Sequence, residues 1–550
     1  MPTVSAHVAV TLAAHVDHVF GVMGNGNAYF LDALCGTDAL FTAVRHEAGA
    51  VVAADSLHRA SGRLAAATTT YGAGFTNTLT ALAEAVQAHV PLVLVVGDEP
   101  TSGPRPWDVD QIAMASAVGA RTYTVGRADA AATTVIAVEH ALTYRVPTVL
   151  ALPYDVAALD AGPVPETLPP YLPQPLAPRG AFADGVVQEI ATALASARRP
   201  LLLAGRGAWA AGAGAALGAL ADATGALTVT TALGRGIFPR SEFDLGVAGG
   251  FGGEKAMALV READVAVVVG ASLNQFTMRF GDLFAPGTRV FQIDVAPAAT
   301  HPHVGGYVRG DAATVAAAIV AEHATLEGAS PSGWRESVDV ASARRHEPGD
   351  GTAADGRLDP RSAAARLGEL LPEDRVVVSD GGHFLGWANM YWPVSSPDRM
   401  IMVGSAFQAI GLGFPSVVGA ALARPEATVV LTTGDGGGLM ALSDLESAVR
   451  VAGGRGITVV WNDGAYSAEM HLYGRKGLAR EPMLIPDVDF AGVATALGAH
   501  GVVVRAVRDL DALTAWRARP VRDRRFLLLD LRISGAVVAP FWEEIVRASS

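Results

Sequence analysis

The sequence is poor in cysteine, in charged residues and in long apolar runs. Its single cysteine, Cys35, rules out an internal disulfide framework and a metal site built from several thiolates. We expect Cys35 to be a small buried apolar residue. Charged residues make up only 17% of the chain, and the net charge of −13 argues against a surface that binds nucleic acid.

No apolar run is long enough to cross a membrane, because the longest sheet-like runs, such as residues 91–97, are the length of a strand. The N-terminus also lacks the basic region and apolar core of a secretory signal. Half of the residues are hydrophobic, so a chain of 550 residues can bury several large cores. We therefore expect a soluble, cytoplasmic, multi-domain α/β protein without a membrane partner.

Three segments alternate helical patterns with short β-rich runs. They cover residues 1 to 160, 183 to 330 and 359 to 535, and a proline-rich linker at 161–178 separates the first two. Short runs rich in β-branched residues are typical of buried parallel strands. Such runs occur at 19–22, 41–44, 64–69, 92–96, 148–152, 200–204, 265–269, 290–293 and 376–379. The pattern predicts three doubly wound parallel-sheet domains.

The most informative motif is Gly434-Asp435-Gly436-Gly437-Gly438, followed 27 residues after its aspartate by Asn462-Asp463-Gly464. Each motif follows a strand-like run, at 427–433 and 456–461, and residues 439–452 between them have helical spacing with a C-cap at Gly453-Gly454. One right-handed strand–helix–strand unit would place Asp435 and Asn462 at the carboxyl ends of neighbouring strands.

These residue types suit a metal–diphosphate anchor. A carboxylate, an amide oxygen and a backbone carbonyl are ligands for a hard cation such as Mg²⁺. Glycines allow backbone N–H groups to approach a phosphate. The alternative is an ordinary strand–turn–helix unit with a glycine-rich surface loop, which the paired motifs make less favourable.

The two motifs together resemble the thiamine-diphosphate (ThDP) motif of the acetolactate synthase and pyruvate decarboxylase superfamily. The resemblance covers nearly the whole chain. It implies a pyrimidine-binding domain at 1–160, a central Rossmann-like domain at 183–330 and a diphosphate-binding domain at 359–535. It also implies that Asp435, Asn462 and the carbonyl of Gly464 hold Mg²⁺, and that Gly434, Asp435, Gly436 and Gly437 lie against the cofactor.

Glu47 is the candidate for the acid that activates the cofactor. It opens an apolar helix in Arg45-His46-Glu47-Ala48-Gly49-Ala50, where a helix-capping role alone would fit better. The segment resembles the one that carries the activating glutamate in acetolactate synthases. The resemblance implies that Glu47 bonds the aminopyrimidine ring, so that the ring's amino group can remove the thiazolium C2 proton.

Two further segments resemble parts of the cofactor site. Residues 69–77, with Tyr71 and Asn77, resemble the loop beside the cofactor pyrimidine, although a tight turn alone explains any one of them equally well. Ile410, in Ala409-Ile410-Gly411-Leu412-Gly413-Phe414-Pro415, resembles the apolar residue that wedges between the two cofactor rings. Taken alone it is an ordinary core isoleucine.

Two candidates for contact with the substrate lie in the first segment. Asn25 occupies the loop where pyruvate decarboxylases carry an acidic residue. Residues 101–111 also lack the paired histidines of those enzymes. Gln111 resembles the glutamine of the synthases instead.

The third segment contributes two more candidates. Glu469 stands seven residues after Asn462, whereas decarboxylases place a catalytic glutamate six residues after theirs, so its role stays open. His383, in Asp380-Gly381-Gly382-His383-Phe384, either contacts a phosphate or the substrate, or is an ordinary loop histidine with its own partners.

The central segment lacks a dinucleotide-binding fingerprint, since no GxGxxG with a downstream acid occurs there. Acetolactate synthases bind FAD in this domain, and Gly270–Thr277 is where flavin contacts would be sought. We favour a scaffold, and FAD binding is the alternative.

Together these features favour a ThDP- and Mg²⁺-dependent, acetolactate-synthase-like carboligase. It would decarboxylate a 2-oxo acid and transfer the acyl-anion equivalent to a second carbonyl compound. The alternatives are a non-oxidative 2-oxo acid decarboxylase or carbon–carbon lyase, and a non-catalytic cofactor-binding subunit. The resemblance also implies a homodimer or homotetramer with active sites between chains.

Overall fold

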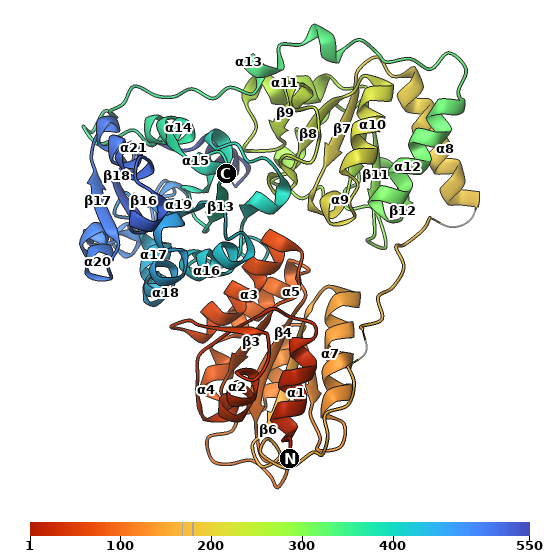
Figure 1. Cartoon of the computed structure of the whole chain (residues 1–550). Helices are drawn as coiled ribbons and strands as arrows, with labels where there is room; N and C mark the ends of the chain where they lie inside the picture. Colours follow the sequence, from red (N-terminus) through yellow and green to blue (C-terminus); the bar gives the residue numbers. More distant parts are fainter. Residues whose placement is uncertain (168, 179–180, 550) are drawn as a thin grey trace.

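The computed structural model describes residues 1–167, 169–178 and 181–549, without the side chains of residues 181 and 182. It contains three α/β lobes joined in sequence order (Figure 1). Each lobe is built on one six-stranded sheet, and all the strand pairs of these sheets are parallel. The predicted fold class is confirmed. Within the described residues, no helix combines the length and the apolar character that crossing a membrane requires.

The first sheet has the strand order β2-β1-β3-β4-β6-β5. Its strands are β1 His18–Gly21, β2 Leu40–Ala43, β3 Ala66–Thr69, β4 Leu92–Asp98, β5 Arg121–Thr124 and β6 Pro147–Pro153. The helices are α1 Val4–Ala13, α2 Ala28–Leu34, α3 Glu47–Ser61, α4 Ala73–Thr76, α5 Leu79–Gln87, α6 Gln111–Ala117 and α7 Ala130–Tyr144. Because β1, β3 and β4 are neighbours, the loops that follow them gather at one edge of the sheet.

The central sheet has the order β12-β11-β10-β7-β8-β9. Its strands are β7 Pro200–Ala204, β8 Leu227–Thr230, β9 Asp244–Val247, β10 Val265–Val269, β11 Arg289–Asp294 and β12 Val304–Arg309. Its helices are α8 Ala181–Ser196, α9 Arg206–Ala210, α10 Gly214–Thr224, α11 Glu254–Glu262, α12 Ala312–Thr325 and α13 Val340–Ala343. The described residues of the linker, 161–167 and 169–178, contain neither helix nor strand.

The third sheet has the order β14-β13-β15-β16-β18-β17. Its strands are β13 Val376–Ser379, β14 Met400–Ile401, β15 Val429–Gly434, β16 Gly456–Asn462, β17 His500–Val504 and β18 Leu527–Arg532. Its helices are α14 Pro360–Leu370, α15 Leu385–Tyr391, α16 Gly413–Ala423, α17 Asp435–Met440, α18 Ser443–Ala452, α19 Ser467–Leu472, α20 Phe490–Ala496, α21 Asp511–Arg517 and α22 Pro540–Ala548.

Two expectations about local structure were wrong. The helix expected at 439–452 is two helices, because α17 begins at Asp435 itself and a turn at Ala441–Leu442 separates it from α18. The C-cap at Gly453 is as expected, with φ of 49°. Cys35 is exposed rather than buried, because it caps the end of α2, just past the face that buries Phe30 and Leu34.

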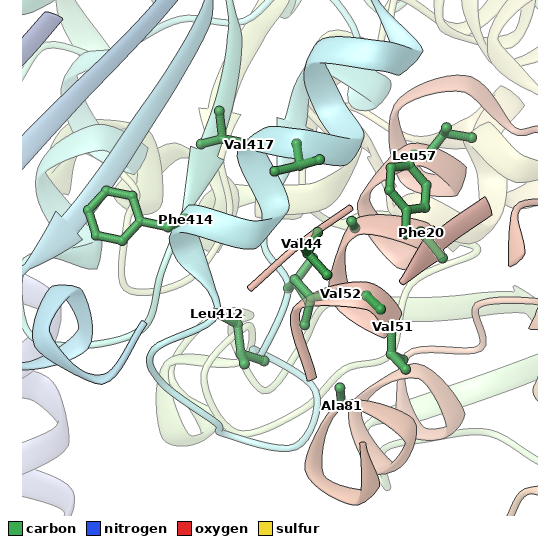
Figure 2. Close-up of a cluster of buried hydrophobic side chains, with 14 of the residues drawn as sticks. Phe20, Val44, Val51, Val52, Leu57, Ala81, Leu412, Phe414 and Val417 are labelled. Carbon is green, nitrogen blue, oxygen red and sulfur yellow. The ribbon is translucent and has the colours of Figure 1, made fainter. Parts of the chain in front are cut away.

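The first and third lobes share one hydrophobic core. Helix α3 of the first lobe crosses α16 of the third, and buried side chains from both meet there, including Val52 and Val417 (Figure 2). The helices approach closely because Gly419 faces backbone: a Cβ there would lie 2.0 Å from the Ala53 oxygen. This contact fixes the start of α3, which carries Glu47, relative to the start of α16.

Candidate functional site

The carboxyl ends of β15 and β16 bring the two glycine motifs together, as expected from the sequence. Gly434 pairs with Trp461 at the last step of the ladder. Asp435 follows at once as the first residue of α17, and it is almost fully buried. Its Oδ1 accepts the N–H of Gly436 at 2.9 Å, and its Oδ2 accepts the N–H of Gly464 at 2.8 Å. One carboxylate thus joins both motifs.

Asn462, the last residue of β16, is held with its amide oxygen free. Its Nδ2 donates to Oδ1 of Asp530 at 2.9 Å and to the carbonyl of Val488 at 3.3 Å. Asp530 is buried on β18 and receives Nη2 of Arg532 at 2.7 Å. No donor among the described residues reaches Oδ1 of Asn462, which leaves that oxygen available to a cation. The supporting pair Asp530 and Arg532 was not expected from the sequence, because no motif surrounds either residue.

The electrostatics of this edge favour a bound cation. Burial, followed by the charge of Asp463, raises the pKa of Asp435 to about 7. Burial raises the pKa of Asp463 itself to about 6, although Ser467 Oγ donates to it at 2.5 Å. Two carboxyl groups in one poorly solvated place are destabilised when both are ionised, and a divalent ion would relieve this.

The donor set therefore fits Mg²⁺ bound together with a phosphate. Within the described ranges, no three His, Cys, Asp or Glu side chains are grouped so that they alone could hold a metal ion. The edge offers one carboxylate, one amide oxygen and the carbonyl of Gly464, which also accepts the N–H of Ile485 at 2.8 Å. Mg²⁺ commonly uses one or two carboxylates and completes its shell with water and substrate phosphates.

The glycines of the motif are required by their neighbours. A Cβ on Gly436 would lie 2.6 Å from the Tyr466 ring, and one on Gly434 would lie 2.9 Å from the Phe384 ring. At Gly437 it would lie 2.7 Å from Oδ2 of Asp380. A side chain at any of these three positions would therefore collide with a neighbouring residue.

Ile410 lies half-buried beside the same edge, on a loop held by Asp380. Oδ1 of this buried carboxylate accepts the N–H groups of Gly381 at 2.8 Å, Gly411 at 3.0 Å and Leu412 at 3.4 Å. Thr433 Oγ1 donates to Oδ2 at 3.1 Å. Burial raises the pKa of Asp380 in spite of these bonds. From the sequence, Asp380 was visible only as part of the segment that carries His383, with no role of its own.

Glu47 lies at the matching edge of the first lobe, as the first residue of α3. It is half-buried, and its Oε2 accepts Nδ2 of Asn77 at 2.9 Å. The helix is capped by His46, whose Nδ1 accepts the N–H of Ala48 at 3.2 Å. Glu47 is therefore not the N-cap, and its carboxylate faces the loop that carries Asn77.

The loops after β1, β3 and β4 meet beside Glu47. Asn25 is exposed and donates from Nδ2 to Tyr71 Oη at 2.8 Å. Gln111 is buried, and all of its polar groups are used: Oε1 accepts the N–H of Gly72 at 2.7 Å, and Nε2 donates to Gly97 O at 2.9 Å and to Asp98 Oδ1 at 3.0 Å. Gln111 thus fixes the loop that carries Tyr71 and presents no free group.

His383 and Glu469 have opposite surroundings. His383 is buried among aromatic rings, its Nε2 accepts the N–H of Ala539 at 2.9 Å, and burial followed by the charges of His471 and Arg475 lowers its pKa to about 3. It is a neutral ring that anchors the start of α22. Glu469 is exposed on α19, and its carboxylate has no hydrogen-bond or ion-pair partner in the described part of the chain.

The candidate residues thus form two groups. Glu47, Tyr71, Asn77, Asn25 and Gln111 lie on the first lobe, whereas the Asp435 group and Ile410 lie on the third. No hydrogen bond or ion pair among the described residues joins the two groups directly. The two lobes are instead joined by residues outside these groups. For example, the N–H of Arg45 on the first lobe donates to Oδ1 of Asp444 on the third at 2.8 Å.

Comparisons with known proteins match this arrangement. Thiamine pyrophosphate (ThDP) enzyme models match the N-terminal TPP binding domain at residues 2–117, the central domain at 187–319 and the C-terminal TPP binding domain at 380–530. The sulfoacetaldehyde acetyltransferase of Castellaniella defragrans is 28% identical, over 98% of this chain and 94% of its own length.

Two other relatives are synthase subunits. The acetolactate synthase isozyme 3 large subunit of Escherichia coli is 27% identical, over 95% of this chain and 93% of its own. A probable acetolactate synthase large subunit of Methanocaldococcus jannaschii is 28% identical, over 79% of this chain and 75% of its own. With all three domain models matched in order, the chain belongs to the thiamine pyrophosphate enzyme family and is a ThDP-dependent enzyme.

Proposed function

We propose that the protein is a Mg²⁺-dependent carboligase that decarboxylates a 2-oxo acid and transfers the acyl unit to a second carbonyl compound. When bound, ThDP supplies the carbon nucleophile that takes up the acyl unit and stabilises the charge left by CO₂. Asp435, Asn462 and the Gly464 carbonyl would hold the metal, and Gly434, Gly436 and Gly437 would leave room for the diphosphate. The domains run from 1 to 160, 183 to 330 and 359 to 535.

The residues of the first lobe supply the acid. Glu47 would share a proton with the pyrimidine ring, and Asn77, which donates to its Oε2, holds the carboxylate in place. Tyr71 would lie beside the same ring. Ile410, whose loop is fixed by the buried carboxylate of Asp380, would contact the cofactor between its two rings.

One observation at position 25 favours carboligation over simple decarboxylation. At position 25, where the resemblance places the acid of the simple decarboxylases, the chain has an amide that donates to Tyr71 Oη. An amide does not deliver a proton to a carbanion at neutral pH. The acyl unit would therefore remain available to a carbonyl acceptor, and the exposed carboxylate of Glu469 would be free to contact that acceptor. The names of two relatives, an acetolactate synthase and an acetyltransferase, agree with transfer of the acyl unit to an acceptor.

The proposal includes a homodimer, or a tetramer of two such dimers, with each site between two chains. Large apolar side chains are exposed beside both groups of site residues, which supports an apposed surface. Near the first group these are Met23, Tyr29, Trp107 and Ile112, and near the second Phe407, Met440 and Leu484.

The central domain is proposed as a scaffold without FAD. Its strand order reverses between β7 and β10, where nucleotides bind in open sheets of this kind. Here the loops after β7 and β10 pack backbone against backbone, since a Cβ on Gly205 would lie 2.5 Å from the Gly270 oxygen and one on Gly270 would lie 2.1 Å from the Ala208 nitrogen.

The products of the reaction test the proposal. The purified protein with ThDP and Mg²⁺ is incubated with pyruvate, alone and with a second 2-oxo acid or aldehyde, and the products are separated. We expect a 2-hydroxy ketone or 2-hydroxy-3-oxo acid. Aldehyde as the sole product would make the enzyme a decarboxylase or lyase.

Glu47→Gln tests the acid itself. The amide keeps the size of the side chain but has no proton to share, so turnover should fall by about 10²-fold or more. ThDP affinity should stay near that of the wild type, because the diphosphate anchor is intact. Undiminished turnover would remove Glu47 from its role.

A further inference from the structure

A buried ionic network in the first lobe contacts the loop that carries Ile410. Arg59 on α3 is paired with Asp55, with Nε to Oδ1 at 2.5 Å, and with Glu84 on α5, with Nη2 to Oε1 at 3.0 Å. The side chains are 4%, 1% and 0% exposed. Charges buried so completely are costly, so a network that only joined two helices could be replaced by apolar residues at little loss.

The network holds a segment of the third lobe. Arg59 Nη1 donates to the carbonyl of Met402 at 3.2 Å. The carboxylate of Glu84 accepts the N–H of Phe407 at 2.7 Å and, more weakly, that of Ala406 at 3.4 Å. A donor and an acceptor from the first lobe thus fix the two ends of the segment 402–407.

Apart from these bonds to the first lobe, segment 402–407 is held by few hydrogen bonds and is partly exposed. Residues 405–408 are exposed, and the backbone has positive φ at Gly404, at Gln408 and at Gly411. Within it, Ser405 Oγ donates to Met402 O at 2.8 Å and the N–H of Ala409 donates to Gly404 O at 2.9 Å. Asp380 fixes the backbone just after Ile410, so Ile410 lies between two buried carboxylates from different lobes.

We propose that Glu84 is a positioning residue, which together with Arg59 fixes segment 402–407 and thereby the place of Ile410 against the cofactor. The inference rests on the proposed role of Ile410 between the cofactor rings. Helix α5 also starts two residues after Asn77, the partner of Glu47. One helix of the first lobe therefore aligns the acid and the separating side chain.

The test uses the holoenzyme with ThDP and Mg²⁺ and three variants. Glu84→Asp keeps a charge for Arg59 but is one methylene shorter, so it cannot also hold the N–H of Phe407. Glu84→Gln keeps the length and loses the charge. Asp55→Asn is the matched control, because it removes a buried charge paired with Arg59 while Asp55 makes no hydrogen bond to segment 402–407 and Arg59 Nη1 keeps its bond to the Met402 carbonyl.

Two quantities are measured for each protein: the melting temperature and the rate at which the C2 proton of bound ThDP exchanges with deuterium. We expect all three variants to melt below the wild type. Only the Glu84 variants should slow the exchange, by about tenfold or more, since a displacement of about 1 Å has effects of this size. Slowing by Asp55→Asn to the same extent would reduce Glu84 to a stabilising contact and overturn the proposal.

Ile410→Ala distinguishes the proposed role of Glu84 from the proposed role of Ile410. If Ile410→Ala slows the exchange and Glu84→Asp does not, the positioning role of Glu84 is refuted while the cofactor site stands. If Ile410→Ala exchanges at the wild-type rate, the role of Ile410 is wrong, and the inference built on it is refuted too.

Discussion

Replacing Gly419 by alanine should both destabilise the protein and impair its site. Gly419 lies on α16 where this helix crosses α3. An added methyl carbon would lie 2.0 Å from the oxygen of Ala53 and 2.7 Å from the nitrogen of Leu57. Both are helix backbone atoms that cannot turn aside, so the two helices must separate by more than about 1 Å to restore ordinary contact distances.

The cost follows from what the crossing buries. Overpacking of a well-filled core costs about 1–3 kcal/mol, and each kcal/mol lowers the melting temperature of a domain of this size by about 2–4 °C. We therefore expect Gly419→Ala to melt about 5 °C lower. Ile410 lies three residues before α16, so a displacement of about 1 Å should also reduce turnover by as much as 10²-fold.

Gly185→Ala is the matched control. Gly185 is exposed within α8, and nothing lies within 4 Å of a Cβ placed there. Alanine in a helix is favoured over glycine by about 0.5–1 kcal/mol, so this variant should melt at or above the wild-type temperature. Calorimetry measures the melting temperature of both variants, and a turnover assay measures their activity. A Gly419→Ala protein that melts with the wild type would refute the close crossing of α3 and α16.

The remaining predictions concern the proposed metal site and one buried acid. Asp530→Ala should weaken Mg²⁺-dependent ThDP binding by about tenfold, because Asn462 loses the acceptor that orients its amide, whereas Asp435→Ala removes a proposed ligand and should weaken it further. A Mg²⁺ titration at fixed ThDP measures both, and unchanged affinity in Asp530→Ala would contradict the orienting role. Burial raises the pKa of Asp244 from 3.8 to about 6, so ionisation favours the unfolded chain as the pH rises through this window. Asp244→Asn should thus be more stable than the wild type above pH 6, by on the order of 2–3 kcal/mol, and equally stable near pH 3.8. Unfolding curves at the two pH values would contradict this if the difference did not grow with pH.

Most of the central strands could be predicted from the sequence because both of their faces are buried, although β8 and β18, which are equally buried, were not expected. β7, β10 and β13 have the expected bounds, and every residue in them is buried. The strands that were missed include edge strands with half-exposed residues. β5 reads Arg121-Thr-Tyr-Thr124 and none of its residues is buried, and β17 has one buried residue among five. β5 carries no continuous apolar run to recognise, and β17 has only the short run Val502–Val504 after His500 and Gly501.

The supporting residues of the site could not be predicted for a different reason. Asp530, Asp380 and Glu84 are single acids without a local pattern around them. Asp530 contacts a partner 68 positions away, Asp380 one 31 positions away and Glu84 one 323 positions away. Such contacts exist only once the strand order and the crossing of α3 with α16 are known. The glycine motifs were recognisable because their spacing follows from a single strand–helix–strand unit.

Burial separates the four remaining candidates, Asn25, Gln111, His383 and Glu469, into two pairs. Every polar group of Gln111 is used inside the first lobe, and the ring of His383 is neutral and buried beneath α22. A substitution at either position would act by moving the loop of Tyr71 or the start of α22. Asn25 and Glu469 are exposed, the former on the first lobe and the latter on the third. We therefore expect changes in the choice of acceptor from substitutions at Asn25 and Glu469, and losses of cofactor binding or stability from those at Gln111 and His383.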